Sequence, residues 1–399
     1  MKPAPYDMTF ITDIVSANVH ESSVSAIKEM TMLSAKVEGA AMLSWGLPSF
    51  RTPEYVRKGV IEYIDNDVQV GKYTLPDGLP ELRKLAADAY KKKTGIEVDA
   101  DENIMISAGN MQALNTLFHT MLDAGDEIIL TDPCFASHIQ QINLFSGKPV
   151  FWPLDKANGW NLDVDALPGL ITDKTQAIVL VSPSNPTGKI FAKEDLIRVG
   201  EIARQHNILL ILDDPYSDFL YENRDKYFNL ASVEELKEHI VYLYSFSKSY
   251  AMGGWRLSYM VMPAELKREA IKVHDATMIC APRISQLAGI VALSQPSDHK
   301  QEFETILARR RELICQRLDN VPHVFAYQKP EGAYYIFPKI IAAHTNSKKF
   351  AIDLLYNAKV TVTQGSAFGP SGENHVRLAY CVDEDIINLA FDRIEKYFA

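Results

Sequence analysis

The sequence predicts an α/β fold, in which a large domain with a mostly parallel sheet flanked by helices is joined to a small α+β domain. Three observations predict it. From about residue 100 onward, apolar stretches of strand length alternate with stretches of helical periodicity. Residues 177–181 and 208–212 are apolar throughout, which is typical of strands buried in a parallel sheet. From about residue 320 to the end, short strands and helices are mixed instead.

Length and charge narrow the class of protein further. A chain of 399 residues can bury a large core, and its length favours two domains. The formal net charge is −10. The short basic runs at 91–93 and 309–311 are predicted to be solvated helix faces, so we expect no nucleic-acid partner.

The cysteines and the amino terminus bear on location. The four cysteines lie far apart, and no two form a C-x-x-C pair. This spacing favours a reduced compartment over a disulfide framework or a metal site. The chain has no basic-then-apolar leader, and no segment has the apolar length that spans a bilayer. We therefore expect a cytoplasmic protein with no membrane partner and no bound metal.

In the N-terminal part, a polar, serine-rich helical stretch precedes the segment 42–50. Gly46 in this segment indicates a backbone position that another group approaches closely, with an ordinary turn glycine as the alternative. Further along, Pro-Asp-Gly at 76–78 predicts a turn, and a helix is predicted to begin at Pro80.

The first strand of the large domain is predicted over 103–107, followed by a tight turn and a helix over 112–122. Backbone amides at the start of a helix can hold an anion, and the helix macrodipole helps. We therefore choose Gly109, Asn110 and Met111 as backbone donors to an anionic group.

Two later strands end in polar residues. The strand 177–181 leads into a loop in which Asn185 is held near two prolines, so its direction is fixed. The strand 208–212 ends in Asp213 and Asp214. A carboxylate at the end of a buried strand is costly unless it is paired. Strand alternation sends only one of the two, Asp213 or Asp214, into a site.

The stretch from Ser245 to Arg256 follows the apolar strand 240–244 and is the centre of the predicted site. Burial lowers the pKa of an amine such as that of Lys248, and a neutral amine can form a Schiff base with a carbonyl. Arg256 is suited to a phosphate, and Ser245 and Ser247 add donors. The stretch predicts a lysine imine to an aldehyde cofactor that carries a phosphate, with a snorkelling surface lysine as the alternative.

The remaining elements close the sheet and build the small domain. A last strand of the large sheet is predicted over 257–262, and helical segments, broken at Pro282 and Pro296, run to about residue 320. In the last of these helices, Arg310 interrupts the apolar face. The tail strands are predicted over 325–337, 360–363 and 376–380.

Five motifs, in the same order along the chain, resemble those of the class I and II, fold-type I pyridoxal-phosphate aminotransferases. They are Y-x4-G-x3-L-R from Tyr73, S-P-x-N-P-T-G around Asn185, D-x-x-Y from Asp213, S-x-S-K followed at +8 by Arg256, and V-R-L around Arg377. The string D-D-P-Y departs from the more common D-E-x-Y but keeps both functional positions. The resemblance runs from about residue 43 to 380 and implies a seven-stranded sheet.

The resemblance implies that pyridoxal 5′-phosphate is the cofactor and that Lys248 binds it covalently. Lys248 would then move the proton from the substrate Cα to the cofactor's C4′. Further roles follow from matching positions: Asp213 pairs with the ring nitrogen, Tyr216 and Asn185 bond the ring oxygen, Phe135 stacks on the ring, and Gly109, Asn110, Met111, Ser245, Ser247 and Arg256 hold the phosphate.

The resemblance also implies substrate contacts and an assembly. Arg377, with Asn185 and Gly46, would bind the α-carboxylate of the substrate. Tyr73 would reach the cofactor phosphate of a partner subunit, which implies a homodimer with shared active sites. The expected domains are a large cofactor-binding domain at 51–287 and a small domain made of 1–50 and 288–399.

Met111 bears on the substrate, because some aspartate-using relatives carry a lysine at this place. We find no replacement lysine or arginine in the sequence, which favours an apolar or aromatic L-amino acid as donor to a 2-oxo acid in a ping-pong reaction. Three alternatives stay open: an aspartate- or alanine-type aminotransferase, a pyridoxal-phosphate β-lyase and a non-catalytic ligand sensor. A nicotinamide dehydrogenase lacks support, because no G-x-G-x-x-G follows a strand.

Overall fold

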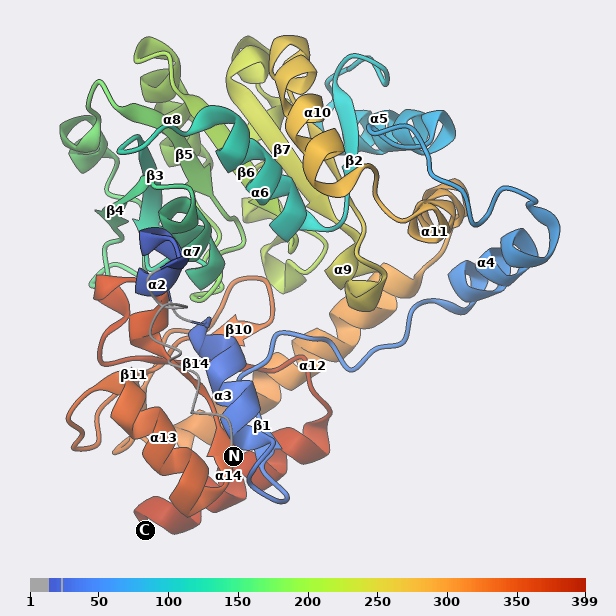
Figure 1. The fold of residues 1–399 in the computed structure, drawn as a ribbon. Helices are drawn as coiled ribbons and strands as arrows, with labels where there is room; N and C mark the ends of the chain where they lie inside the picture. The colour runs from blue at the N-terminus through green and yellow to red at the C-terminus, as the bar shows by residue number, and fades with distance from the viewer. Residues whose placement is uncertain (1–13, 23) are drawn as a thin grey trace, which may run out of the picture.

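The computed structural model describes residues 14–22 and 24–399. Its centre is the predicted mostly parallel sheet of seven strands (Figure 1). In spatial order the strands are β2 (Ile104–Ser107), β8 (Ser258–Val261), β7 (Ile240–Ser245), β6 (Leu209–Asp214), β5 (Thr175–Leu180), β3 (Glu127–Asp132) and β4 (Lys148–Pro153). Only β8 runs antiparallel to its neighbours.

The side chains of each central strand alternate between two apolar layers, because successive residues of a strand point to opposite faces. Ile128 and Leu130 pack into one layer and Ile129 into the other. The first layer is completed by α6 (Asn110–Met121), α7 (Ala136–Leu144) and α10 (Ala264–Met278). The second is completed by α4 (Glu54–Asn66), α5 (Pro80–Thr94), α8 (Lys193–Gln205) and α11 (Arg283–Ser294). Helices therefore cover both faces of the sheet.

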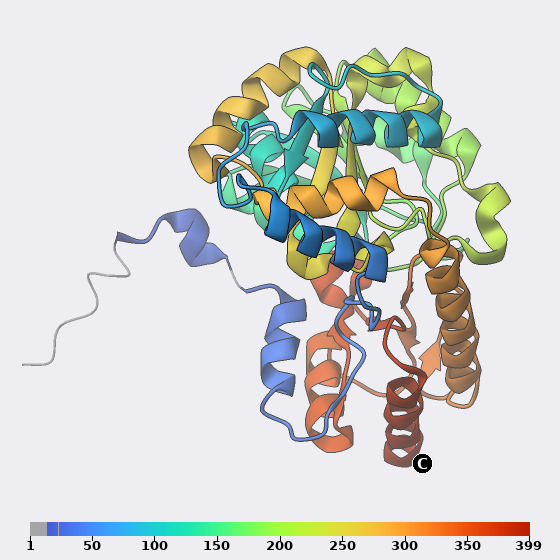
Figure 2. The same cartoon turned by 90° about the vertical axis from the view of Figure 1, so that its right-hand side faces the viewer.

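A second group of elements comes from both ends of the chain and lies beyond the carboxyl ends of the large sheet's strands (Figures 1 and 2). Its helices are α3 (Ala26–Ser34), α12 (His299–Asp319), α13 (Ser347–Ala358) and α14 (Glu384–Phe398). Its strands are β1 (Ala41–Met42), β9 (Phe325–Ala326), β10 (Tyr335–Ile336), β11 (Lys339–Ile340), β12 (Val360–Thr361), β13 (Thr363–Gln364) and β14 (Val376–Ala379). Because β1 pairs in parallel with β12, the N-terminal segment is held to the C-terminal third.

Most predicted strands of the large sheet are confirmed within two residues at either end. The helix predicted from residue 112 begins earlier, at Asn110, because Gly109 is its N-cap. The long tail strand predicted over 325–337 is wrong: only β9 and β10 form within it, and residues 327–334 between them contain no strand. A short helix, α2 (Ala17–Glu21), precedes α3. Residues 1–13 and 23 of the predicted small domain lie outside the described residues.

The prediction that residues 309–311 form a solvated helix face is wrong for two of the three. Arg310 and Arg311 are buried, with 6% and 2% of their surface exposed. Arg310 donates to the Cys381 carbonyl and to Asp383, and Arg311 forms an ion pair with Glu222. A buried guanidinium is tolerated when its donors are paired in this way. Arg310 therefore continues the packed face of α12 instead of interrupting it.

The basic run at 91–93 is also only partly a solvated face. Lys91 and Lys92 are exposed, as predicted. Lys93 turns inward and forms an ion pair with Asp214 at 3.3 Å. Among the described residues, no helix has the length and apolar character needed to cross a bilayer, and no cluster of His, Cys, Asp or Glu could hold a metal ion.

Candidate active site

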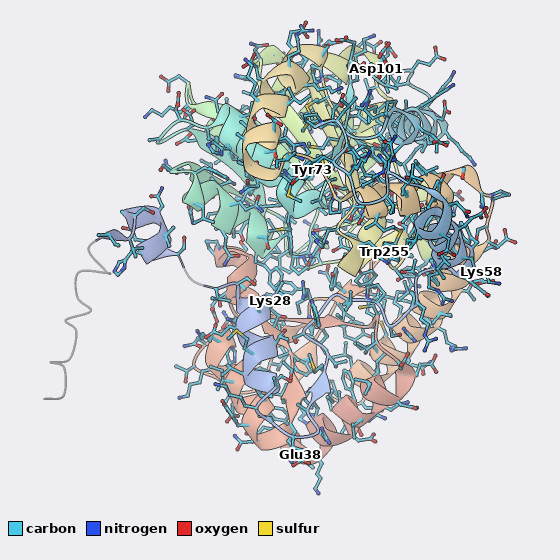
Figure 3. All side chains as sticks on the ribbon, turned by 45° about the vertical axis from the view of Figure 1, so that its right-hand side comes forward. Lys28, Glu38, Lys58, Tyr73, Asp101 and Trp255 are labelled. Atoms are coloured by element: carbon cyan, nitrogen blue, oxygen red, sulfur yellow. The ribbon has the colours of Figure 1, made fainter. Side chains whose placement is uncertain are left out.

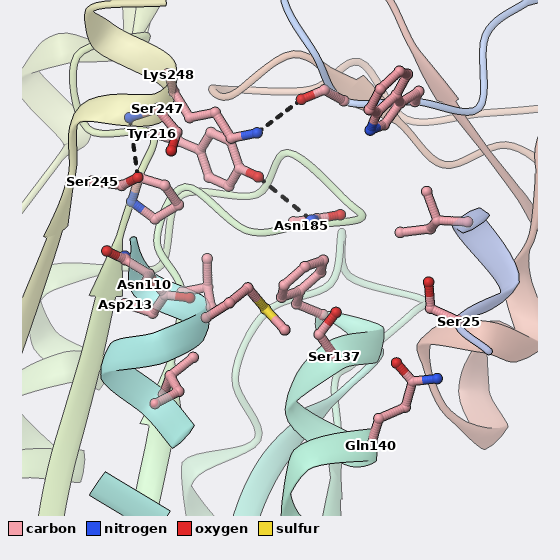
Figure 4. A pocket seen from close by; sticks show the side chains of 18 of the residues that line it. Ser25, Asn110, Ser137, Gln140, Asn185, Asp213, Tyr216, Ser245, Ser247 and Lys248 are labelled. Carbon is pink, nitrogen blue, oxygen red and sulfur yellow. Dashed lines mark hydrogen bonds between the residues drawn. The ribbon is translucent and has the colours of Figure 1, made fainter. Parts of the chain in front are cut away.

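A cavity of about 490 Å3 lies where the large sheet's strands end and the second group of elements begins. It is at this edge of an open α/β sheet that ligands bind in general. Most residues that the sequence predicted for the site line the cavity: Gly46, Asn110, Met111, Phe135, Asn185, Asp213, Tyr216, Ser245, Ser247, Lys248, Arg256 and Arg377. Gly109 lies directly behind Arg256, and Tyr73 does not line the cavity. Of these lining residues, Figure 4 labels Asn110, Asn185, Asp213, Tyr216, Ser245, Ser247 and Lys248.

Lys248 projects into this cavity from α9 (Phe246–Ser249), a single helical turn that begins as β7 ends. The Ser245 hydroxyl caps this turn by accepting a hydrogen bond from the Ser247 amide at 3.2 Å. The Lys248 Nζ donates to the carbonyl of Gly46 at 2.8 Å (Figure 4). Burial is the main reason that the pKa of Lys248 is lowered to about 8. The neutral, nucleophilic form of this amine is therefore far more populated near neutral pH than that of an ordinary lysine.

An anion cradle lies at the N-terminus of α6. Its N-cap, Gly109, has φ +83° and offers no side chain to the first helical amides. A Cβ at Gly109 would lie 2.3 Å from Nη2 of Arg256, so glycine is needed both for the backbone angle and for the arginine. Burial lowers the pKa of Arg256. A guanidinium beside uncapped helix amides is a site that can hold a phosphate.

Asp213 is the carboxylate that faces the cavity. Its side chain accepts a hydrogen bond from Asn110 Nδ2 at 2.6 Å, and its other oxygen lies 3.1 Å from His138 Nε2. Asp214 points to the opposite face of the sheet, where the Tyr242 hydroxyl donates to it at 2.6 Å. This alternation is the one expected for adjacent strand residues. These two contacts hold the Asp213 carboxyl group in a place where it can pair with a ring nitrogen.

Asn185 and Tyr216 form a polar pair on the other side of the cavity. Asn185 Nδ2 lies 3.5 Å from the Tyr216 hydroxyl, which in turn lies 3.1 Å from the Tyr335 hydroxyl. Burial raises the pKa of Tyr216 well above its ordinary value, so its hydroxyl stays protonated and can donate to an oxygen. Phe135 presents an aromatic ring to the same space.

Arg377 lies deepest, with 1% of its surface exposed. Its Nη1 donates to Asn185 Oδ1 at 3.1 Å and its Nη2 to the Ser44 carbonyl at 2.6 Å. The guanidinium also stacks on the ring of Tyr335, at 4.4 Å from the centroid. None of these contacts neutralises its charge, so Arg377 can bind a carboxylate.

The residues present fit pyridoxal phosphate. The cofactor has an aldehyde, a phosphate and a ring nitrogen that is most useful when protonated. Lys248, the Gly109–Arg256 cradle and Asp213 offer one matching group to each. Glycine is needed at position 46, since a Cβ there would lie 1.9 Å from the Tyr335 hydroxyl.

Several functional candidates escaped the sequence analysis. His138 carries no motif, although it lies one helical turn after Phe135 and packs edge-on against it at 5.4 Å. Tyr335 belongs to a Glu-Gly-Ala-Tyr-Tyr string to which no role could be assigned. Lys28 and Trp45 also line the cavity. For Lys28 no sequence signal exists, because only the fold brings α3 to this edge of the sheet.

Comparisons with known proteins identify the family of this chain. The family model described as "Aminotransferase class I and II" matches residues 41–394. An aspartate aminotransferase of Pyrococcus horikoshii is 34% identical over 93% of this chain and 94% of its own. An aromatic-amino-acid aminotransferase of Thermococcus litoralis is 33% identical over 93% and 95%.

The solved structures are similar as well. That of an alanine aminotransferase from Pyrococcus furiosus has a TM-score of 0.90 and 30% identity, covering 96% of this chain and 99% of its own. Members of this family depend on pyridoxal phosphate, for which the cavity has matching groups. The chain therefore belongs to the class I and II aminotransferases and is a pyridoxal-phosphate-dependent aminotransferase.

Proposed function

We propose that this aminotransferase takes the amino group of an apolar or aromatic L-amino acid and passes it to a 2-oxo acid in a ping-pong reaction. The observation that carries the choice of donor is the wall of the cavity along α6, where Met111 and Leu114 face the space beside Phe135. No cation comes from this helix, so an apolar side chain is the natural occupant of the wall.

Lys248 is proposed as the residue that binds the cofactor and then moves the proton. Pyridoxal phosphate, when bound, supplies a carbonyl carbon for the amino nitrogen and a ring that withdraws electrons from Cα. The Lys248 amine takes the proton from the substrate Cα and returns it to the cofactor carbon that bore the aldehyde. Its lowered pKa, about 8, suits both directions of transfer near neutral pH.

The other residues hold the reacting groups in place. Asp213, fixed by Asn110 and His138, keeps the ring nitrogen protonated. Arg377 binds the α-carboxylate, and Asn185, which accepts from Arg377 at 3.1 Å, orients it. Because these groups are buried, the charge interactions are strong and little reorganisation is needed during the reaction.

The phosphate and the ring have their own proposed contacts. The amides of Gly109, Asn110 and Met111, with the guanidinium of Arg256 and the hydroxyls of Ser245 and Ser247, hold the phosphate. Phe135 stacks on the ring, and Tyr216 donates to the ring oxygen. The uncapped start of α6 and the approach of Arg256 to Gly109 support this assignment.

We further propose a homodimer, a cytoplasmic location and the two domains given by the sequence. Tyr73, labelled in Figure 3, has 77% of its surface exposed and does not line its own chain's cavity, which supports a contact with a partner's site. The four cysteines are free and buried, which supports a reducing compartment. An apolar cluster that lies mostly in the second group of elements supports a small domain of 1–50 and 288–399, although Val181, Tyr216, Phe219 and Tyr221 of the large domain join it. The large domain, 51–287, would end inside α11.

A donor panel tests the proposal. The purified holoenzyme is mixed with single L-amino acids and one 2-oxo acid, and the new amino acid, the new oxo acid and free ammonia are all measured. We expect apolar and aromatic donors to yield the first two products in equal amounts, without ammonia. Ammonia and an oxo acid without amino transfer would indicate the β-lyase, and binding without any product would indicate a ligand sensor.

A further inference from the structure

We propose that Lys28 is the residue through which the same cavity accepts a dicarboxylic substrate. It would bind the distal carboxylate of an acidic amino acid or of the corresponding 2-oxo diacid. This inference rests on the proposed function, because a ping-pong enzyme must admit two different substrates to one cavity in turn. The apolar wall on α6 serves one of them, and Lys28 serves the other.

The position of Lys28 is the first support. It lies near the N-terminal end of α3, which approaches the cavity from the second group of elements (Figure 3). Ser25, which caps this helix by accepting from the Lys28 amide at 3.3 Å, lines the cavity as well. In the close-up, Ser25 faces Asn110 and Asp213 from across the open space (Figure 4). Lys28 therefore lies opposite the part of the cavity assigned to the cofactor.

The second support is the set of positively charged residues that line the cavity. Four cations line the cavity: Lys28, Lys248, Arg256 and Arg377. The last three are matched to the aldehyde, the phosphate and the α-carboxylate. Within residues 14–22 and 24–399, no ion pair involves Lys28, and its Nζ lies 4.6 Å from the centre of the Trp45 ring. Lys28 is therefore the cation of the cavity that has no anion assigned to it.

The third support is the segment that Trp45 belongs to. The Ser44 carbonyl accepts from Arg377 at 2.6 Å, and the Gly46 carbonyl accepts from Lys248 at 2.8 Å. Trp45, between them, carries Lys28 on its ring. Three successive residues, 44 to 46, thus contact Arg377, Lys28 and Lys248 in turn. Arg377 is proposed for the α-carboxylate, Lys28 for the distal carboxylate and Lys248 for the proton transfer. A dicarboxylate held at Arg377 would extend its far end towards Trp45 and Lys28.

The position of Lys28 within its helix does not favour a lysine. The macrodipole of a helix favours anions, not cations, in its first turn, and Lys28 lies in the first turn of α3. Its neighbour Glu29 pairs with Lys348 on α13 instead. A cation resting on an exposed aromatic ring is weakly held and can leave when a carboxylate arrives. Trp45 can then cover an apolar substrate side chain in the other half-reaction.

The test compares Lys28→Met with Lys28→Arg and with Lys36→Met, a matched control. Lys36 is an exposed lysine just beyond the end of the same helix and does not line the cavity. Each holoenzyme is reacted separately with L-glutamate, L-aspartate, L-phenylalanine and L-leucine, and kcat/KM is obtained for the single half-reaction. Binding of glutarate and of hexanoate, which cannot react, is measured by calorimetry.

We expect Lys28→Met to lower kcat/KM for the acidic amino acids by about 10- to 50-fold, the loss typical of a charged hydrogen bond. The apolar donors should stay within about twofold, and Lys28→Arg should recover most of the loss, since it keeps the charge. Glutarate should bind more weakly to Lys28→Met, while hexanoate binding is unchanged. Lys36→Met should behave as the unmodified enzyme.

Equal losses for acidic and apolar donors, or no loss for the acidic ones, would overturn the role of Lys28. The proposed donor class can fail separately. If the unmodified enzyme reacts with acidic donors alone, the apolar donor is wrong, whereas the glutarate comparison still decides the role of Lys28.

Discussion

At the scale of single residues, burial determines the chemistry of Lys248. Its pKa falls from the ordinary 10.5 to about 8, mainly because the charged ammonium loses solvation in the cavity. In the chain without cofactor, the amine is mostly protonated below about 8 and mostly neutral above it. The neutral form is the nucleophile, so the capture of the cofactor should depend on pH through this one group.

We predict that the rate at which the apoprotein captures pyridoxal phosphate rises about tenfold per pH unit below the pKa and levels off above it. The measurement is stopped-flow absorbance in the visible region, at constant ionic strength. Lys248→Ala is the control and should give no imine band at any pH. A rate that continues to rise up to the pKa of an ordinary lysine would show that the amine is not desolvated.

His138 makes a second prediction at this scale. Its Nε2 lies 3.1 Å from Asp213, so His138→Leu removes one of the two groups that fix the carboxylate. We expect kcat to fall about tenfold with little change in KM. The variant loses a hydrogen bond to the Asp213 carboxyl group, which is proposed to act on the cofactor ring and not to bind the substrate. His119→Leu, at an exposed position on α6, is the matched control. A change in KM alone would contradict the assignment.

Residues of the site differ in how far the sequence could predict them. Lys248, Asn185 and Asp213 lie in strings whose order and spacing are specific, and all of them line the cavity. His138 and Lys28 come from helices whose positions depend on packing between segments far apart in the chain. No local pattern distinguishes them from an ordinary core histidine or an ordinary surface lysine, so only the fold could identify them.

At the scale of elements, the start of α6 combines two requirements in Gly109. Its φ is +83°, and a Cβ there would lie 2.3 Å from Arg256. Gly95, which ends α5, also has a positive φ, +81°, but its ψ is −8° where that of Gly109 is 158°. A Cβ at Gly95 would meet nothing within 4 Å. Gly95 therefore serves as a comparison at which a positive φ occurs without a contact to Arg256.

We predict that Gly95→Ala, in the left-handed helical region, loses about 1–2 kcal/mol of stability. Gly109→Ala should lose more, because its combination of φ +83° and ψ 158° is open almost only to glycine. Only Gly109→Ala should weaken the binding of pyridoxal phosphate, by about tenfold or more, because Arg256 must move away from the phosphate position. Thermal unfolding and equilibrium dialysis measure the two effects. Equal cofactor affinity in both variants would show that the Gly109–Arg256 contact does not form the phosphate site.

Strands of the large sheet were predictable because burial on both faces makes them apolar throughout, a pattern that survives without knowledge of their neighbours. The strands of the C-terminal tail were harder to predict. Tyr334 is fully buried although it lies outside any strand, so apolar composition alone overestimated the length of the tail strand. The ion pair of Arg311 with Glu222 likewise joins elements distant in sequence, which explains why a buried arginine was taken for a surface one.

At the scale of the whole molecule, both ends of the chain contribute to one cavity, and Tyr73 is proposed to add a group from a second subunit. A mixed-dimer experiment tests this. Lys248→Ala and Tyr73→Phe subunits are each expected to be impaired, and refolding them together should restore activity. In the mixed dimer, one cavity has both an intact Lys248 and an intact Tyr73 from its partner. Ultracentrifugation verifies that mixed dimers have formed. If they show no restored activity, Tyr73 does not act in the cavity of the partner subunit.

We propose that Lys248 holds pyridoxal phosphate in a cavity suited to amino transfer. The most direct test of this proposal is the visible spectrum of the purified holoenzyme, recorded before and after a single amino acid and then a 2-oxo acid are added. We predict a yellow imine band that bleaches with donors of the accepted class and returns with the oxo acid. A band that no amino acid bleaches, or the absence of any band when pyridoxal phosphate is supplied, would contradict the account.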